Sequence, residues 1–167
     1  MGPLMHRVLR SLFALALLAP FGLALAQQHY WYDGQARRAL WSDAADVADF
    51  GAPVTEKSAV LRPAALAGGA SPSKSPVFRD RASGGGHRRA LPGGVVVSVP
   101  AGLDEPARQA LFARHALTAV RSLGPGSQTW LVQAPPGIAS LELANRLYES
   151  GEFAAASPNW WQARVHK

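Results

Sequence analysis

The chain has 167 residues, no cysteine, and a formal net charge of +6 from 17 Lys and Arg against 11 Asp and Glu. This length allows one domain with a real core, or a small domain with long appendages. The lack of cysteine excludes disulfide bonds, thiolate metal ligands and cysteine nucleophiles, so the hydrophobic core alone must hold the fold.

Residues 1–26 have the three parts of a secretory signal peptide. A basic start precedes the apolar run Leu12–Ala19, and Ala24–Ala26 forms a small-x-small cleavage site. The run is too short to span a bilayer, which favours cleavage over the alternative of a membrane anchor. We therefore expect a mature chain that begins at Gln27, is exported to the periplasm or the cell exterior, and does not associate with a membrane after cleavage. Removing the segment, whose only charged residues are two arginines, lowers the net charge to +4.

Segment 27–50 is rich in aromatic residues around an Asp33–Gly34 pair. Bulky rings favour strand backbone and glycine supplies the positive φ of a tight turn, so the pattern predicts a β-hairpin. The rings of Tyr30, Trp31 and Tyr32 could bind a carbohydrate or a partner, but rings are more often buried, so we favour a hairpin that covers the main domain. The end of the segment, Asp43–Phe50, fits either a helical turn or a short strand.

Segment 51–90 is rich in Ala, Gly, Pro and Ser and is expected to be a flexible linker. Within it, Ser75–Arg79 could be a short strand that pairs near Ala90 and Leu91 as a second hairpin. Basic residues gather around the intervening loop. Because only Phe78 is interleaved with them and the protein is exported, we expect a solvated rim or a steering surface for an acidic partner rather than a nucleic-acid patch. These basic residues are Arg79, Arg81, His87, Arg88 and Arg89.

Residues 91–161 are expected to form the folded domain. The β-branched run Gly94–Val99 predicts a central strand. Asp104 offers an N-cap for a helix that continues to about His115. Leu117–Leu123 and Gln128–Ala134 then predict two antiparallel strands, and because side chains alternate, both faces of this pair carry large apolar groups.

A second helix is expected to begin at a Ser140 cap and to end at Gly151. Its apolar face is Leu143, Ala144, Leu147 and Tyr148. A last strand, Phe153–Ala156, should stop before Pro158, which cannot donate to a ladder.

The expected fold class is α+β. The order strand, helix, strand, strand, helix, strand predicts a ferredoxin-like split βαββαβ domain: a four-stranded antiparallel sheet with two helices on one face. One or more β-hairpins and the flexible linker precede it. The remaining segment, 162–167, is expected to be an extended C-terminal tail.

The region from about Leu91 to Trp161 resembles the prodomain of subtilisin-like serine proteases, of the inhibitor I9 type and closest to the fervidolysin-like variety. The aromatic-Gly segment Tyr30–Gly34 also resembles the hairpin that opens some of these precursors. The matching stretches within the domain are Val95–Val99, His115–Leu117, Trp130–Val132, Gly137–Asn145, Glu149–Glu152 and Ser157–Asn159.

The resemblance implies a protein that assists the folding of a subtilisin-like protease as an intramolecular chaperone does, and then inhibits it. In the family, the open sheet face packs on the protease and the extended C-terminal tail lies in the active-site cleft. Carried over by position, the tail is Pro158–Lys167 and the sheet surface comes from Leu117–Ala134. The residues expected to bind the protease are Leu117, Trp130, Leu131, Ser157, Pro158, Asn159, Trp160 and Trp161.

The three motif segments that carry the catalytic triad of the family's protease domain do not occur in this sequence, and the histidines have no spacing typical of a triad or metal site. We therefore expect no enzyme activity, no catalytic residue, no metal and no cofactor. The expected function is inhibition or folding of a subtilisin-like protease in trans, by a protein that is a monomer when free. The alternatives are a remnant or truncated protease precursor without inhibitory role, and a ferredoxin-like module that binds an extracellular polymer.

Overall fold

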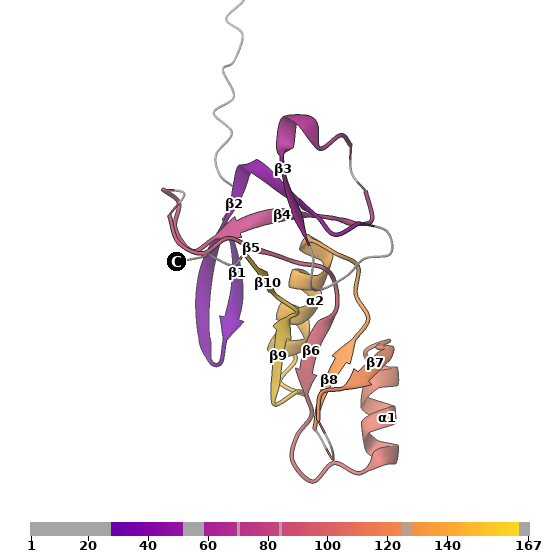
Figure 1. Ribbon diagram of the computed structural model, residues 1–167. Coiled ribbons are helices and arrows are strands. Elements are labelled where there is room, and N and C mark those ends of the chain that lie inside the picture. Colours follow the sequence, from indigo (N-terminus) through magenta and orange to yellow (C-terminus); the bar gives the residue numbers. More distant parts are fainter. Residues whose placement is uncertain are drawn as a thin grey trace, which may run out of the picture.

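The described part of the chain has a mixed α+β fold with two α-helices and two antiparallel sheets (Figure 1). The computed structural model describes residues 28–51, 59–69, 71–83, 85–124, 126 and 128–163. The expected signal peptide, 1–26, lies outside the described residues.

The N-terminal sheet was not expected as a sheet of its own. Its strands run in the order β1-β2-β4-β5-β10, and β3 pairs with the second half of β2. The strands are β1 Gln28–Asp33, β2 Ala36–Asp49, β3 Val60–Pro63, β4 Lys74–Arg79, β5 Arg89–Ala90 and β10 Trp161–Gln162, and the short 3-10 helix η1 is Ala64–Leu66.

The aromatic hairpin is confirmed. β1 and β2 pair from Gln28 opposite Trp41 to Asp33 opposite Ala36, and Gly34 in the turn has a φ of +59°. The ambiguous segment 43–50 continues β2 as a strand as far as Asp49.

The segment 51–90 is less of a linker than expected, because it contains β3, η1, β4 and β5. β4 lies in the middle of the N-terminal sheet, where Val77 and Phe78 are fully buried on opposite faces. The second hairpin is confirmed, because Phe78 of β4 pairs with Arg89 of β5. Val77 and Phe78 are thus buried although the flanks of β4 are rich in Gly, Pro and Ser.

The C-terminal sheet has the strand order β7-β8-β6-β9, with every neighbouring pair antiparallel. Along the chain its elements alternate as β6-α1-β7-β8-α2-β9. They are β6 Val95–Ser98, α1 Glu105–Arg114, β7 Ala119–Ser122, β8 Thr129–Val132, α2 Ile138–Glu149 and β9 Ala155–Pro158.

The expected cap of α1 is confirmed, because the Asp104 carboxylate accepts the Ala107 N–H at 2.9 Å. The expected Ser140 cap of α2 is wrong. Gly137 is the N-cap, and the Ser140 hydroxyl, buried inside the first turn, donates to the Gly137 carbonyl at 2.9 Å. Gly151 follows the end of α2 with a φ of +71°, as a C-terminal glycine should.

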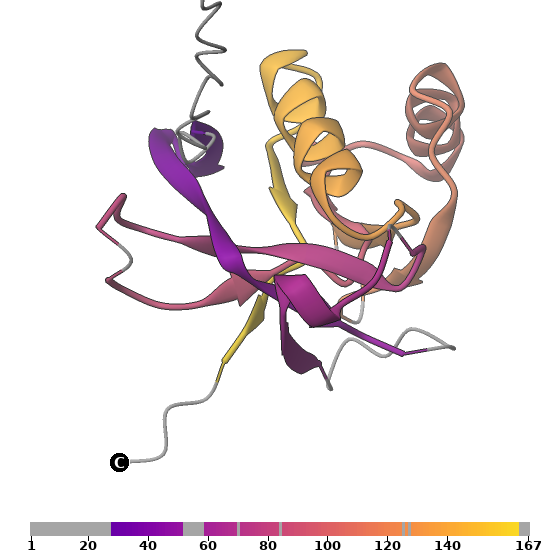
Figure 2. The same cartoon turned by 90° about the horizontal axis from the view of Figure 1, so that it is seen from above.

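Among the described residues there are three apolar clusters, and the second of them joins the two sheets. The first lies between both helices and one face of the C-terminal sheet, and Figures 1 and 2 show the helices on the same side of that sheet. The second joins α2 to one face of the N-terminal sheet through Leu40, Phe78, Leu91 and Leu141. The third lies on the opposite face of the N-terminal sheet. The helix α2 is therefore shared by both sheets.

Candidate functional site

The residues predicted to lead into the tail lie inside the fold. Ser157 and Pro158 belong to β9, opposite Val96 and Val95 of β6. The expectation of a last strand over 153–156 that stops before Pro158 is therefore wrong. Proline is tolerated here because β9 is the edge strand of its sheet, where one side of the backbone needs no partner.

Asn159 follows β9 and is hydrogen-bonded to the segment between β5 and β6. Its backbone N–H donates to the Gly94 carbonyl at 3.3 Å, and its side-chain Nδ2 donates to the Gly93 carbonyl at 3.1 Å. Both glycines have positive φ, and an ideal Cβ on Gly93 would lie 2.6 Å from the Ala134 carbonyl oxygen. The Gly-Gly pair thus lets the chain before β6 pass close to Leu131 and Ala134, while its two carbonyls accept the hydrogen bonds of Asn159.

Trp160 and Trp161 carry the chain into the N-terminal sheet. Trp161 pairs with Ala90 of β5, and beyond it the Ala163 N–H donates to the Arg88 carbonyl at 3.1 Å. The expectation that the chain is a free tail from Pro158 onward is therefore wrong as far as Ala163. The last residues of the expected tail, 164–167, lie outside the described residues.

Two of the predicted contact residues face the helices instead of the open side of the sheet. Trp130 packs edge-on against Phe112 of α1, with ring centroids 6.3 Å apart, and the Arg108 guanidinium lies 4.1 Å from its ring centre. Leu117 packs against the same cluster. We correct the prediction for both, because side-chain alternation alone could not assign which face the helices cover.

Leu131 lies on the face opposite the helices but is only 4% exposed. The Gly94 backbone lies so close that an added Cβ there would be 2.9 Å from Leu131 Cδ1. Leu131 is therefore covered by its own chain and offers little surface to a partner, contrary to the prediction. Around it this face carries the half-buried Val96, Ser98 and Ser157 and the exposed Ala155 and Arg121.

The apolar surface of this sheet lies at its edge. All four residues of β7 are exposed, and Val120 retains 57% of its surface accessibility. Leu123, which follows β7, is 39% exposed. A register shift between Ala119 and Arg121 places Val120 at a β-bulge. This exposed pair could not be separated by sequence from the other apolar residues of the hairpin.

Three of the five basic residues of this loop are paired with acidic residues, two of them from β2 and one, Asp80, from the loop itself. Arg79 contacts Asp43 at 2.6 Å, Arg88 contacts Asp46 at 3.4 Å, and Arg89 contacts Asp80 at 3.3 Å. These pairs weaken the expectation of a steering surface.

The Asp43–Arg79 pair is mostly buried, with side chains 11% and 15% exposed. Burial opposes ionisation of Asp43, but hydrogen bonds from the Arg79 side chain and the Ala45 N–H outweigh it, so the pKa of Asp43 lies below its ordinary value. The pair therefore ties β2 to β4 as an ionised carboxylate and a guanidinium.

The aromatic hairpin packs on α2, as we favoured. The hydroxyls of Tyr30 and Tyr32 donate to the Glu149 carboxylate at 2.9 and 3.0 Å, and this hydrogen bonding raises the pKa of both tyrosines. Tyr32 also stacks on Tyr148 with ring centroids 4.1 Å apart. Rings engaged in this way leave less surface for a stacked sugar than free rings would.

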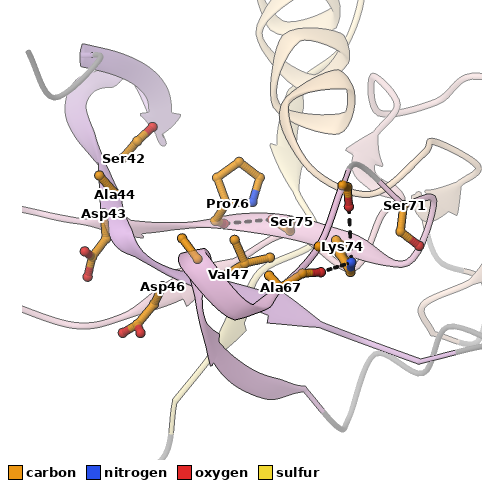
Figure 3. Close-up of a pocket in the computed structure, with 13 residues that line it drawn as sticks. Ser42, Asp43, Ala44, Asp46, Val47, Ala67, Ser71, Lys74, Ser75 and Pro76 are labelled. Atoms are coloured by element: carbon orange, nitrogen blue, oxygen red, sulfur yellow. Dashed lines mark hydrogen bonds between the residues drawn. The ribbon is translucent and has the colours of Figure 1, made fainter. Parts of the chain in front are cut away.

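A pocket of about 410 Å³ lies where β2 bulges away from β4 (Figure 3). Asp43 is opposite Val77 and Val47 is opposite Pro76, so the residues between Asp43 and Val47 loop out. On the other wall, Lys74 Nζ donates to the carbonyls of Ala67 and Gly69. The charged groups around the pocket are thus already engaged and do not converge on its centre.

Among the residues that the structure describes, no group of three or more His, Asp or Glu side chains is gathered for a metal ion. In the same residues, no helix is long and apolar enough to cross a membrane.

Comparisons of this chain with protein-family models, with curated proteins and with solved structures found no match.

Proposed function

We propose that this chain is an exported, non-catalytic protein that binds a subtilisin-like serine protease in trans, as an inhibitor, a folding assistant or both. The proposal starts from the sequence resemblance. The element order β6-α1-β7-β8-α2-β9, with both helices on one face, supports a ferredoxin-like split βαββαβ arrangement for the C-terminal sheet.

The observation that carries the proposal is the sheet face left without a helix, bordered by the exposed strand β7. Scattered exposed apolar residues are ordinary, but Val120 and Leu123 stand at the edge of the face that the family uses for the protease. The protease contact is therefore assigned to this edge, and not to Trp130 or Leu131.

The segment proposed to inhibit the protease is also shorter than the sequence predicted. Since Ser157 to Ala163 are held in the two sheets, the part that would enter a protease cleft is reduced to the residues after Ala163. Deleting everything from Pro158 would remove two tryptophans from the core, so loss of inhibition in that variant would not isolate the tail. Deleting 164–167 is the cleaner change.

The test is a titration of the chain from Gln27 to Lys167 against a panel of subtilisin-like proteases, with inhibition and cleavage both recorded. Val120→Asp should weaken binding at least about tenfold, because an aspartate would be desolvated in the interface. Val60→Asp is the matched control, since Val60 is 56% exposed against 57% for Val120 but lies on β3 of the other sheet. Deleting 164–167 should weaken inhibition without changing the melting temperature.

Equal effects of Val120→Asp and Val60→Asp would overturn the assigned contact edge. A folded protein that binds none of the proteases would overturn the proposed function and favour the remnant alternative.

A further inference from the structure

We infer that Trp160 and Trp161 form a clasp that joins the N-terminal sheet to the point where the chain leaves the C-terminal sheet. Trp161 begins β10 and Trp160 precedes it, and the two side chains pack on opposite faces of the N-terminal sheet. Trp160 enters the cluster shared with α2, and Trp161 enters the cluster on the other face. One dipeptide is thus anchored in two separate cores.

Trp160 lies among residues from three strands of the N-terminal sheet. Its ring meets Trp31 of β1 edge-on at 5.3 Å and Phe78 of β4 at 6.2 Å. The Arg89 guanidinium lies 5.9 Å from the Trp160 ring centre and 5.4 Å from that of Trp31, and Asp80 contacts it at 3.3 Å. Arg89 thus makes cation–π contacts with both indoles.

Trp161 is fixed by its backbone and by its ring. It stands opposite Ala90 in β5, and its ring meets Phe50 edge-on at 6.3 Å. The next backbone hydrogen bond, from the Ala163 N–H to the Arg88 carbonyl, extends this pairing by two residues. Just before the clasp, Asn159 is bonded to the carbonyls of Gly93 and Gly94.

These contacts fix the position and direction of the chain at Ala163. This inference rests on the proposed function, and deepens it: the N-terminal sheet positions the inhibitory segment. Trp31 and Arg89 are then positioning residues that act through Trp160. A binding segment that follows a fixed attachment point loses less conformational entropy on binding than one attached to a mobile point.

The test compares Trp31→Ala with Tyr32→Ala in the chain from Gln27 to Lys167. These residues are neighbours in β1, but Trp31 contacts the clasp and Tyr32 stacks on Tyr148 of α2. Arg89→Met is a second clasp variant, which keeps an apolar stem and guards against misfolding of Trp31→Ala. Amide hydrogen exchange is read at Ala163, and at Val97 in the centre of the other sheet as an internal reference.

Both clasp variants should speed amide exchange at Ala163 at least about tenfold and leave exchange at Val97 unchanged. They should also weaken protease inhibition at least about tenfold. A tenfold change corresponds to the free energy of the lost aromatic and cation–π contacts. Tyr32→Ala should change neither exchange at Ala163 nor protease inhibition. Unchanged exchange at Ala163 would overturn the clasp. Faster exchange with full inhibition would overturn the positioning role while the proposed function stands. A wild-type chain that inhibits no protease would overturn both functional statements, and the exchange data would still decide the clasp.

Discussion

At the residue scale, Gly93 allows the segment before β6 to pass close to the segment that follows β8. Its φ is +101°, and an ideal Cβ would lie 2.6 Å from the Ala134 carbonyl oxygen and 3.1 Å from the Pro136 nitrogen. Both neighbours are backbone atoms, which cannot turn aside as a flexible side chain would.

We predict that Gly93→Ala lowers the free energy of unfolding by about 2 to 5 kcal/mol, from backbone strain at positive φ together with steric overlap. Urea denaturation measures this loss. The control is Gly102→Ala, where φ is +77° but no atom lies within 4 Å of the added Cβ, so only strain of about 1 to 2 kcal/mol is expected. Equal losses in the two variants would mean that close approach is not what Gly93 provides.

The ion pair of Asp43 and Arg79 should make stability depend on pH. The pKa of Asp43 is lower in the folded protein than its ordinary value of 3.8, so folding favours the ionised form. The resulting stabilisation is fully present above the unfolded pKa and is lost as pH falls through the folded pKa.

We predict that Asp43→Asn lowers the free energy of unfolding at pH 7 by about 1.5 to 3 kcal/mol, the range for hydrogen bonds to charged groups. The difference from wild type should narrow below about pH 4, as the wild-type carboxylate becomes protonated. Denaturation curves between pH 2 and 7 measure it. Asp33→Asn is the control, because the Asp33–Arg38 pair is more than half exposed and should contribute less than about 1 kcal/mol. A gap that stays constant down to pH 2 would contradict the prediction.

At the scale of elements, local signals predicted much of the fold. Asp104 before an acidic first turn identified the start of α1, and Asp33–Gly34 between aromatic runs identified the hairpin β1–β2. Each of these signals uses hydrogen bonds or backbone angles within a few residues. The same is true of Gly151 at the end of α2.

The errors arose where a distant partner decides the outcome. Pro158 looked like the end of a strand, but an edge position lets it remain in β9 opposite Val95. The basic loop looked exposed, but Arg79 and Arg88 are paired with Asp43 and Asp46 from β2. No local pattern contains these pairings, since they depend on how β2 lies beside β4. The burial of Leu131 likewise depends on the backbone of Gly94, just before the neighbouring strand β6.

At the scale of the whole molecule, the C-terminal sheet has one core that does not involve the N-terminal sheet, and the two sheets share a second core. The cluster between both helices and the C-terminal sheet is built only from residues between 95 and 156. The cluster around α2 needs both parts of the chain, because Leu91 and Leu141 pack there with Leu40 and Phe78. The expected 91–161 domain therefore contains one complete core and half of another.

We predict that a fragment of residues 91–163 folds but melts at least about 10 °C below the chain of residues 28–163. Removing the N-terminal sheet exposes Leu91, Leu141 and Trp160. Each fully buried leucine contributes about 1.5 to 3 kcal/mol to the free energy of unfolding. A loss of 1 kcal/mol lowers the melting temperature of a small domain by about 4 to 8 °C. Thermal unfolding followed by circular dichroism measures both chains. Equal melting temperatures would show that the N-terminal sheet adds nothing to the stability of the other, and an unfolded fragment would show that the first cluster cannot form alone. We expect a fragment that folds but melts at a lower temperature, because the two buried faces of α2 belong to different cores and the fragment keeps only one of those cores whole.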